Sequence, residues 1–272
     1  MESFHLSKTV NIKTVSEDEK HGVFEIDGLY TGYGLTLGNA IRRILFSSLP
    51  GAAVTQIKIK NVPHEFYTLP GVKEDMVELT LNFRKLRFRM HTDEPQVLTL
   101  KIKGEKVVTG ADIKTNAQVE VVNPEEILAT LTEKNVELDL ELEVRRGLGF
   151  SPTETRKSEE KLPIGAIAVD AFFSPVTKVN FIVENMRVGD RTDFNRLRLE
   201  IETDGIISPS SALHKAASIL KDHAEKVLGL QVKEFELAKT ETKAPQKKRI
   251  RKTKTAESKV KEEEKEEKKD AA

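Results

Sequence analysis

The chain has 272 residues, with 44 basic and 44 acidic side chains and no cysteine. This length suits one or two domains, and the lack of cysteine excludes disulfides, thiolate catalysis and cysteine-ligated metal sites. The charge is unevenly spread: from Lys239 onward there are 13 basic and 8 acidic residues, a net +5, whereas the preceding part has 31 basic and 36 acidic residues, a net −5. We therefore expect an acidic body with a basic tail.

The sequence carries no sign of a secretory or membrane segment. Met1-Glu2-Ser3 is not followed by a basic and then apolar signal, and no apolar run approaches the length of a membrane span. We therefore expect a cytoplasmic protein without a membrane partner. The last residues are mostly Lys, Glu, Thr and Ala, which cannot bury enough apolar surface to fold, so 236–272 is predicted to be a disordered charged tail.

Two strands and a helix are predicted first. Apolar residues at 10, 12 and 15 mark one strand, and residues 23–26 mark the next. Glycines at 32, 34 and 38 then lead into a helix, with Thr36 as its expected N-cap and Pro50-Gly51 after its end. We interpret the glycines as a tight strand-to-helix turn, because their spacing fits neither a dinucleotide-binding nor a P-loop motif.

This helix has two unlike faces at about 100° per residue. The apolar stripe consists of Leu37, Ala40, Ile41, Ile44 and Leu45, and the opposite side consists of Asn39, Arg42, Arg43 and Phe46. A Phe beside two arginines is typical of a protein-binding surface. The alternative is an ordinary surface helix whose arginines extend into water.

The middle of the chain is rich in alternating strands. Apolar and polar residues alternate over 55–60, 97–102, 119–122 and 136–144, which predicts an antiparallel, mainly β module with one face in water. Asp75 is expected to cap a short helix reaching Phe83. The polar segment from Gly147 to Lys161, with Pro152 inside it, is predicted to be an irregular loop.

Two more strands, 176–188 and 194–203, precede a long helix from Ser208-Pro209 to Gly229. One face of this helix carries Leu213, Ala217, Leu220, Ala224, Val227 and Leu228, and a second apolar track carries Ala212, Ala216 and Ile219. That apolar width exceeds what one small sheet needs. Either a homodimer contact or a core helix packed on two sides explains it. The fold class predicted for the chain is α+β.

No catalytic or metal-binding motif is apparent. The six histidines show no i,i+4 pair, and neither a His-Glu-x-x-His nor a Gly-x-Ser-x-Gly motif occurs. Asp190, Asp193 and Asp204 lack the spacing of a calcium loop. We therefore expect no catalytic residue, metal or cofactor in this chain.

The run from Gly34 to Gly51 closely resembles the first helix of bacterial RNA polymerase alpha subunits. Further segments in the same order strengthen the resemblance, which covers about residues 1–235: His64-Glu65-Phe66, Gly71–Asp75, Asp170–Val176, Arg191–Asp193 and Ala216–Leu220. The resemblance implies a non-catalytic subunit of a DNA-directed RNA polymerase, a nucleotidyltransferase whose magnesium is expected in a partner subunit.

The resemblance also implies a domain organisation. A dimerisation domain of antiparallel sheet and two long helices would comprise 1–50 and 168–235, with an inserted mainly β domain at 51–167. The residues implied at the homodimer interface are Leu37, Ile41, Ile44, Leu45, Leu213, Ala217, Leu220, Ala224 and Val227. The dimer would then scaffold the beta and beta-prime subunits, in a complex that also holds omega and sigma.

By the same resemblance, Arg43 is the residue we expect at the beta contact, in one helix motif with Asn39, Arg42 and Phe46. The residues implied in a second contact region with the large subunits are Ser174, Pro175, Val176, Arg191, Thr192 and Asp193. Arginine suits such a role, because its planar fork pairs with carboxylates or carbonyl oxygens.

The family usually carries a small helical C-terminal domain that binds upstream DNA, and the charged tail shows no apolar periodicity of that kind. The tail residues that could contact DNA phosphates are Lys247, Lys248, Arg249, Arg251 and Lys252. The alternatives are a solvated tail without a binding role and, for the whole chain, a stand-alone dimeric nucleic-acid-binding protein or a nucleotide-dependent enzyme using the glycine-rich turn.

Overall fold

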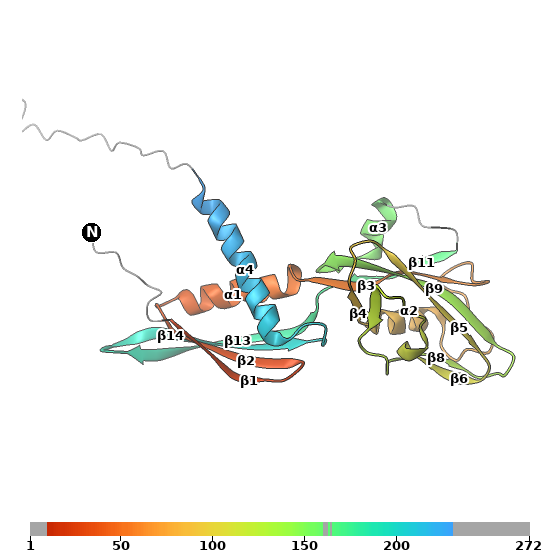
Figure 1. Cartoon of the computed structure of the whole chain (residues 1–272), viewed down its shortest axis with the longest axis horizontal. Helices are drawn as coiled ribbons and strands as arrows, with labels where there is room; N and C mark the ends of the chain where they lie inside the picture. The colour runs from red at the N-terminus through yellow and green to blue at the C-terminus, as the bar shows by residue number, and fades with distance from the viewer. Residues whose placement is uncertain (1–9, 160–162, 164, 231–272) are drawn as a thin grey trace, which may run out of the picture. The chain divides into compact units, whose positions relative to one another are not determined.

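The computed structural model describes residues 10–159, 163 and 165–230 (Figure 1). These residues belong to one compact unit. Two large hydrophobic cores lie within it, and each is built on its own antiparallel sheet. This arrangement agrees with the predicted α+β class.

The first sheet has four strands in the order β1-β2-β14-β13. Antiparallel pairing joins segments far apart in the sequence, with Leu199 of β14 opposite Phe24 of β2. The two pairs of strands predicted from the sequence are thus confirmed as one sheet. Their bounds are Asn11–Glu17 for β1, His21–Leu29 for β2, Val176–Val188 for β13 and Arg191–Thr203 for β14.

Two helices, α1 (Tyr33–Ser47) and α4 (Pro209–Leu228), pack on one face of this sheet and against each other (Figure 1). Leu45 of α1 and Ala216 of α4 are fully buried in the same core. The predicted cap of α4 is confirmed, since the Ser208 hydroxyl accepts from the N–H of Ser211 and Pro209 opens the helix.

The predicted N-cap of α1 is wrong. The helix begins at Tyr33, and Gly32 precedes it with a φ of 85°, a left-handed conformation that favours glycine. Thr36 lies within the first helical turns, and its hydroxyl donates back to the Gly32 carbonyl at 3.3 Å. The turn made by Gly32 therefore moves the start of the helix three residues before the expected cap.

Gly34 and Gly38 serve packing rather than the turn. A Cβ on Gly34 would lie 2.8 Å from Val183, and one on Gly38 would lie 2.7 Å from the ring of Phe181. Both glycines are buried against β13. They let the helix lie close to the sheet, and they do not form a loop open to a phosphate.

The second sheet has the path β5-β9-β3-β4-β7, with β11 pairing with β3. It packs on α2 (Met76–Lys85), where Phe83 is fully buried and Asp75 accepts from the N–H of Glu78 as the predicted cap. The strands of this sheet are β3 (Pro50–Ile59), β4 (Phe88–Met90), β5 (Gln96–Lys103), β7 (Val119–Val121), β9 (Glu137–Leu148) and β11 (Ala166–Ala168). A separate pair, β6 (Lys106–Thr109) and β8 (Ile127–Leu131), lies beside the 3-10 turn η1 (Gly110–Asp112).

The predicted loop from 147 to 161 is largely regular structure. After β9, the short strand β10 (Phe150–Ser151) pairs with β12 (Ala171–Phe172), and α3 (Thr153–Glu159) follows. Polar anchors explain this order: the N–H of Thr153 donates to Asp170 at 2.9 Å, and Arg156 donates to the carbonyl oxygens of Thr55 and Val169. The polar composition of the segment gave no indication of these long-range hydrogen bonds, so the sequence predicted a loop.

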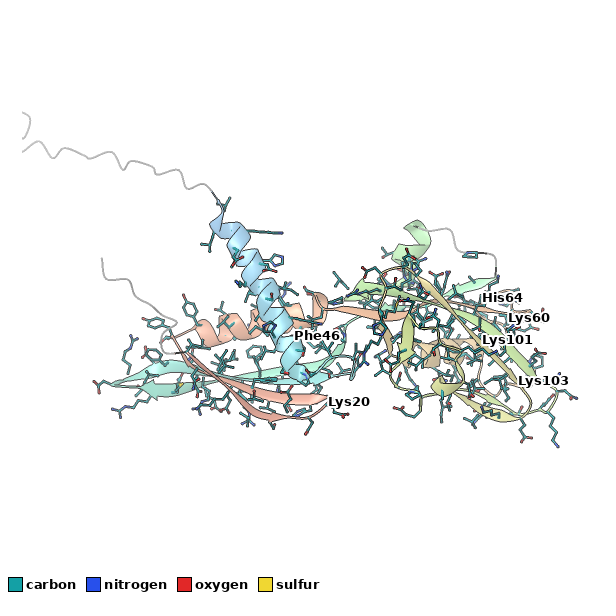
Figure 2. All side chains as sticks on the ribbon, viewed as in Figure 1. Lys20, Phe46, Lys60, His64, Lys101 and Lys103 are labelled. Carbon is teal, nitrogen blue, oxygen red and sulfur yellow. The ribbon has the colours of Figure 1, made fainter. Side chains whose placement is uncertain are left out.

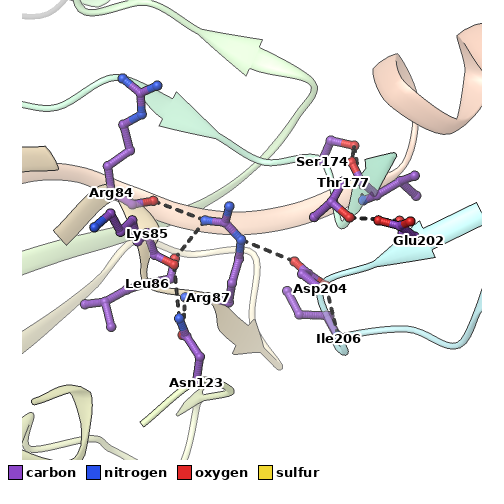
Figure 3. Close-up of polar contacts among 11 residues, drawn as sticks. Arg84, Lys85, Leu86, Arg87, Asn123, Ser174, Thr177, Glu202, Asp204 and Ile206 are labelled. Atoms are coloured by element: carbon purple, nitrogen blue, oxygen red, sulfur yellow. Dashed lines mark hydrogen bonds and ion pairs between the residues drawn. The ribbon is translucent and has the colours of Figure 1, made fainter. Parts of the chain in front are cut away.

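An arginine links the two sheets at the β14–α4 connection (Figure 3). Arg87 precedes β4, and its Nε lies 3.7 Å from the carboxylate of Asp204, which follows β14. Asp204 also accepts from the N–H of Ile206 at 3.0 Å, and burial raises its pKa above the ordinary value. The predicted division at 50/51 and 167/168 stays a prediction, since the two cores share one compact unit.

Candidate functional site

The polar face of α1 is open to solvent, as the sequence predicted. Arg43 and Phe46 are exposed, and Phe46, labelled in Figure 2, is 39% accessible. Arg42 is held within the subunit: it donates to the Asn39 side chain at 3.1 Å and lies 5.2 Å from the ring centroid of Phe181. Within the described part of the chain, the Arg43 guanidinium has no hydrogen bond or ion pair. Arg43 is thus the arginine of this helix left for a partner.

The stripe beneath this face belongs mostly to the subunit's own core. Leu45 is 0% and Ile41 is 5% exposed, so neither presents surface to a second chain. Leu37 and Ile44 are half-buried at the edge of the same core. Of these four residues predicted at a dimer interface, Leu37 and Ile44 therefore have exposed surface, whereas Ile41 and Leu45 lie in the core.

Ser174 lies beside the C-terminal end of α1. Its hydroxyl is 3.4 Å from the Leu45 carbonyl oxygen, which joins this predicted contact residue to the Arg43 face. Pro175 and Val176 come next in the chain, but both are buried, and Val176 is part of the first core. Of these three residues, only Ser174 is partly exposed to solvent.

Sequence reasoning missed an aromatic group beside the same end of α1. Phe150 and Phe172 are 51% and 37% exposed, and their ring centroids lie 4.4 Å apart. The Arg84 guanidinium lies 4.4 Å from the ring centroid of Phe172 and 3.7 Å from Asp170. Gly149, next to Phe150, comes so close to α1 that a Cβ there would lie 3.3 Å from the Ser47 oxygen. Exposed aromatics with an arginine are typical of protein interfaces. The sequence signal was Phe150 inside an otherwise polar segment.

Arg191, Thr192 and Asp193 lie elsewhere, at the far end of the β13–β14 hairpin. Val176 pairs with Thr203 at one end and Val188 with Arg191 at the other, and strands of this length span roughly 40 Å at about 3.3 Å per residue. The predicted second contact region is therefore two separate places. Asp190 and Asp193 likewise cannot share a metal with Asp204, which follows β14.

The hairpin end is held by internal contacts. Arg191 donates to both carboxylate oxygens of Asp193, at 3.0 and 2.6 Å, and its guanidinium lies 5.1 Å from the ring centroid of Tyr30. The Thr31 hydroxyl donates to the same carboxylate at 2.8 Å. The arginine and this hydroxyl lower the pKa of Asp193 to about 2. These contacts fasten the hairpin to the segment that enters α1.

The two apolar tracks of α4 have separate surroundings. Ala212 and Ala216 are fully buried against the first sheet and α1. On the other track Ala217 and Ala224 are exposed, and Leu213 and Leu220 are half-buried. Toward the C-terminal end, Val227 and Leu228 are 64% and 82% exposed. Exposed apolar tracks of this kind are typical of interaction surfaces.

One group of residues has the composition of a metal site. Oxygen and nitrogen atoms of His21, Glu200 and Glu202 lie within 4.8 Å of one another. These side chains already have partners, since His21 Nε2 lies 3.1 Å from Glu200 and Lys178 donates to Glu202 at 2.9 Å. A cross-strand ion-pair network explains the group without a metal. No helix in the described ranges is long and apolar enough to cross a membrane.

Residues 57–174, which include most of the second sheet, match the family model described as the RNA polymerase Rpb3/RpoA insert domain. Proteins similar over most of the chain carry the name DNA-directed RNA polymerase subunit alpha. The one from Moorella thermoacetica is 49% identical over 78% of this chain and 67% of its own length. Those from Symbiobacterium thermophilum and Carboxydothermus hydrogenoformans are 49% and 48% identical over 80% of this chain, and 70% and 69% of their own lengths.

The chain belongs to the family of bacterial RNA polymerase alpha subunits. Its members are parts of a multisubunit nucleotidyltransferase and serve in transcription as assembly scaffolds rather than as the catalytic subunit. The comparisons give no support to the alternative of a stand-alone nucleic-acid-binding protein.

Proposed function

We propose that the chain forms a homodimer through α4 and the edge of α1, and that each copy presents the Arg43 face to a large subunit, beta or beta-prime. The unpaired guanidinium of Arg43 on a rigid helix is the observation that carries this proposal. Beta binds first and beta-prime second, in a cytoplasmic complex that also holds omega and sigma. The catalytic magnesium belongs to the large subunits.

The contact surface extends from Arg43 and Phe46 over Ser174 to the aromatic pair of Phe150 and Phe172. Its residues come from α1, the β12–β13 connection and β10–β12, and they lie at one end of α1. An arginine without an internal partner, beside exposed aromatic rings, is suited to act as an anchor residue that becomes buried when the partner binds. Loss of such an anchor costs about 2 kcal/mol or more of binding free energy.

Size-exclusion chromatography with light scattering tests the partner contact. The wild type is expected to be a dimer that captures the beta subunit of the same organism, and Arg43→Ala to remain a dimer that captures beta at least tenfold more weakly. Arg198→Ala, an exposed arginine on β14, is the matched control and should bind as the wild type does. Equal capture by Arg43→Ala would contradict the contact.

The dimer is tested separately on α4. Leu220→Lys places a charge on the exposed apolar track and is expected to give monomers, whereas Lys226→Ala on the same helix should leave the dimer intact. The free energy of unfolding within one subunit should change little, because the buried track of Ala212 and Ala216 is untouched. A Leu220→Lys protein that stays dimeric would exclude this face as the interface.

The basic stretch from Lys247 to Lys252 lies outside the described residues, and the proposal that it contacts DNA phosphates rests on its charge. Deleting the residues after 240 should flatten the dependence of promoter binding on salt concentration, measured on the assembled polymerase. An unchanged slope would leave the tail without a role in DNA binding.

A further inference from the structure

A cleft of about 180 Å³ opens between the start of α4 and the second sheet. The apolar part of its wall includes Met90 at the end of β4 and the pair Ile206-Ile207 before α4, all partly buried. Three cations complete the wall: Arg89 from β4, Arg146 from β9 and Lys215 from α4. Three elements distant in sequence thus bring positive charge to one hollow.

The charge of this cleft is unlike that of the body around it. None of the ten residues that line it is acidic, although residues before Lys239 carry a net charge of −5. Elsewhere lysines face carboxylates, as Lys101, which is labelled in Figure 2, does with Asp139 at 3.1 Å on the second sheet. Lys215 has no ion pair within the part of the chain that the structure describes.

The two arginines of the cleft already attract carboxylates from its rim. Arg146 lies 2.6 Å from Asp93, and Arg89 lies 3.2 Å from Glu120. The side chains of Asp93 and Glu120 are 85% and 60% exposed, so both can rotate into water at little cost. The arginines are therefore available to another anion that offers more charge.

The cleft is backed by a fixed frame. The other guanidinium nitrogen of Arg89 lies 3.5 Å from the carbonyl oxygens of Gly205 and Ile206, which orients the side chain along the β14–α4 connection. Phe88, directly before it, is 1% exposed in the second core. A hollow of about 350 Å³, more open to solvent, shares Pro50 and Arg146 with the cleft and is also lined by Asp93.

We propose that this cleft binds a small phosphate-bearing anion. A phosphoryl group carries nearly two negative charges and three acceptor oxygens, which suits a cleft lined by three cations better than a single carboxylate does. The apolar wall formed by Met90, Ile206 and Ile207 accepts the uncharged part of such a ligand. Because its cations come from α4 and from the second sheet, the bound anion stabilises the connection between the two sheets.

Isothermal titration of the whole 272-residue chain with pyrophosphate, at low salt and without phosphate buffer, tests the proposal. The wild type should bind saturably, and Lys215→Ala and Arg146→Ala should each weaken binding about tenfold. ADP distinguishes the ligand sources: tighter binding than pyrophosphate identifies a nucleotide, and equal binding identifies the phosphate alone. Light scattering of each variant verifies that it has the same oligomeric state as the wild type.

Two control proteins separate the cleft from other basic regions. Lys226→Ala removes the same charge from a later turn of α4, and Lys247→Ala/Lys248→Ala/Arg249→Ala removes charge from the tail; both should bind pyrophosphate as the wild type does. The proposal is overturned if the wild type shows no saturable binding, if the cleft variants bind normally, or if the tail variant loses the binding.

Discussion

Replacing Arg87 by alanine should weaken the connection between the two sheets by an amount that the contacts define. At the 3.7 Å separation of Arg87 and Asp204, the attraction is about 4 kcal/mol for an effective dielectric constant near 20. The Arg87 side chain is 26% exposed and that of Asp204 is 4% exposed, so solvent screens the pair only in part. The guanidinium also donates to the carbonyl oxygens of Arg84 and Leu86, at 3.1 and 3.2 Å. After desolvation is deducted, we expect Arg87→Ala to lower the free energy of unfolding by about 2–3 kcal/mol.

A double-mutant cycle in urea measures this coupling. In Asp204→Asn the amide oxygen can still accept from the N–H of Ile206, and the buried carboxylate charge is removed. Arg87→Ala should therefore cost less than about 1 kcal/mol in the Asp204→Asn background. An equal loss in both backgrounds would refute the reasoning, because the arginine would then act through its carbonyl contacts alone.

The pH dependence of the same cycle has a defined sign. Burial raises the pKa of Asp204 above its ordinary 3.8, so protonation of this carboxyl stabilises the folded state. The stabilisation by protonation is complete below the unfolded pKa and is lost as the pH rises through the folded pKa. Without Arg87, the unpaired carboxylate of Asp204 destabilises the folded state further. The loss of unfolding free energy in Arg87→Ala, relative to the wild type, should therefore become smaller as the pH falls through the raised pKa of Asp204. A deficit that grew on acidification would contradict this sign.

Three further predictions concern stability, measured by urea unfolding. Leu45→Ala, at a site with 0% exposure, should cost about 2–5 kcal/mol, while the neighbouring Arg43→Ala should stay within about 0.5 kcal/mol; similar losses would contradict the two-faced helix. Gly51→Ala should destabilise strongly, since its Cβ would overlap the carbonyl oxygen of Phe173, and near-wild-type stability would show that this backbone can shift. The hydrogen bond from Arg196 is the main cause of the lowered pKa of Asp27, so this carboxylate stabilises the fold above its unfolded pKa, and that stabilisation is lost as the pH falls through the folded pKa. Asp27→Asn should therefore be less stable at neutral pH, and its free energy of unfolding should depend less on acid. An unchanged acid dependence would rule out this carboxylate as the source of that dependence.

Local sequence patterns predicted the helices and strands better than they predicted which of these elements contact one another. Periodicity placed both long helices and most strands, because a buried face repeats every two residues in strands and about every 3.6 in helices. It also separated the exposed Arg43 from the buried Leu45. The start of α1 was misplaced because a left-handed Gly32, rather than a side-chain cap, begins the helix.

Long-range partners were beyond these patterns. Phe150 was predicted to lie in a polar loop, but its ring packs on Phe172, which follows α3 in the sequence. The family resemblance assigned Ser174 and Arg191 to one contact region, yet a long hairpin separates them. The cations of the cleft come from β4, β9 and α4, and no local spacing predicts that they meet.

The arrangement of α1 and α4 couples the proposed dimer face to the proposed partner surface. Leu45 lies beneath the Arg43 face and Ala216 beneath the exposed track of α4, and both belong to one close-packed core. Such cores transmit strain, so the two helices cannot shift independently. In the dimer proposed above, a second copy that immobilises α4 would therefore also hold the backbone that carries Arg43. Less conformational entropy would then be lost on binding the proposed partner, which would favour dimerisation ahead of that capture.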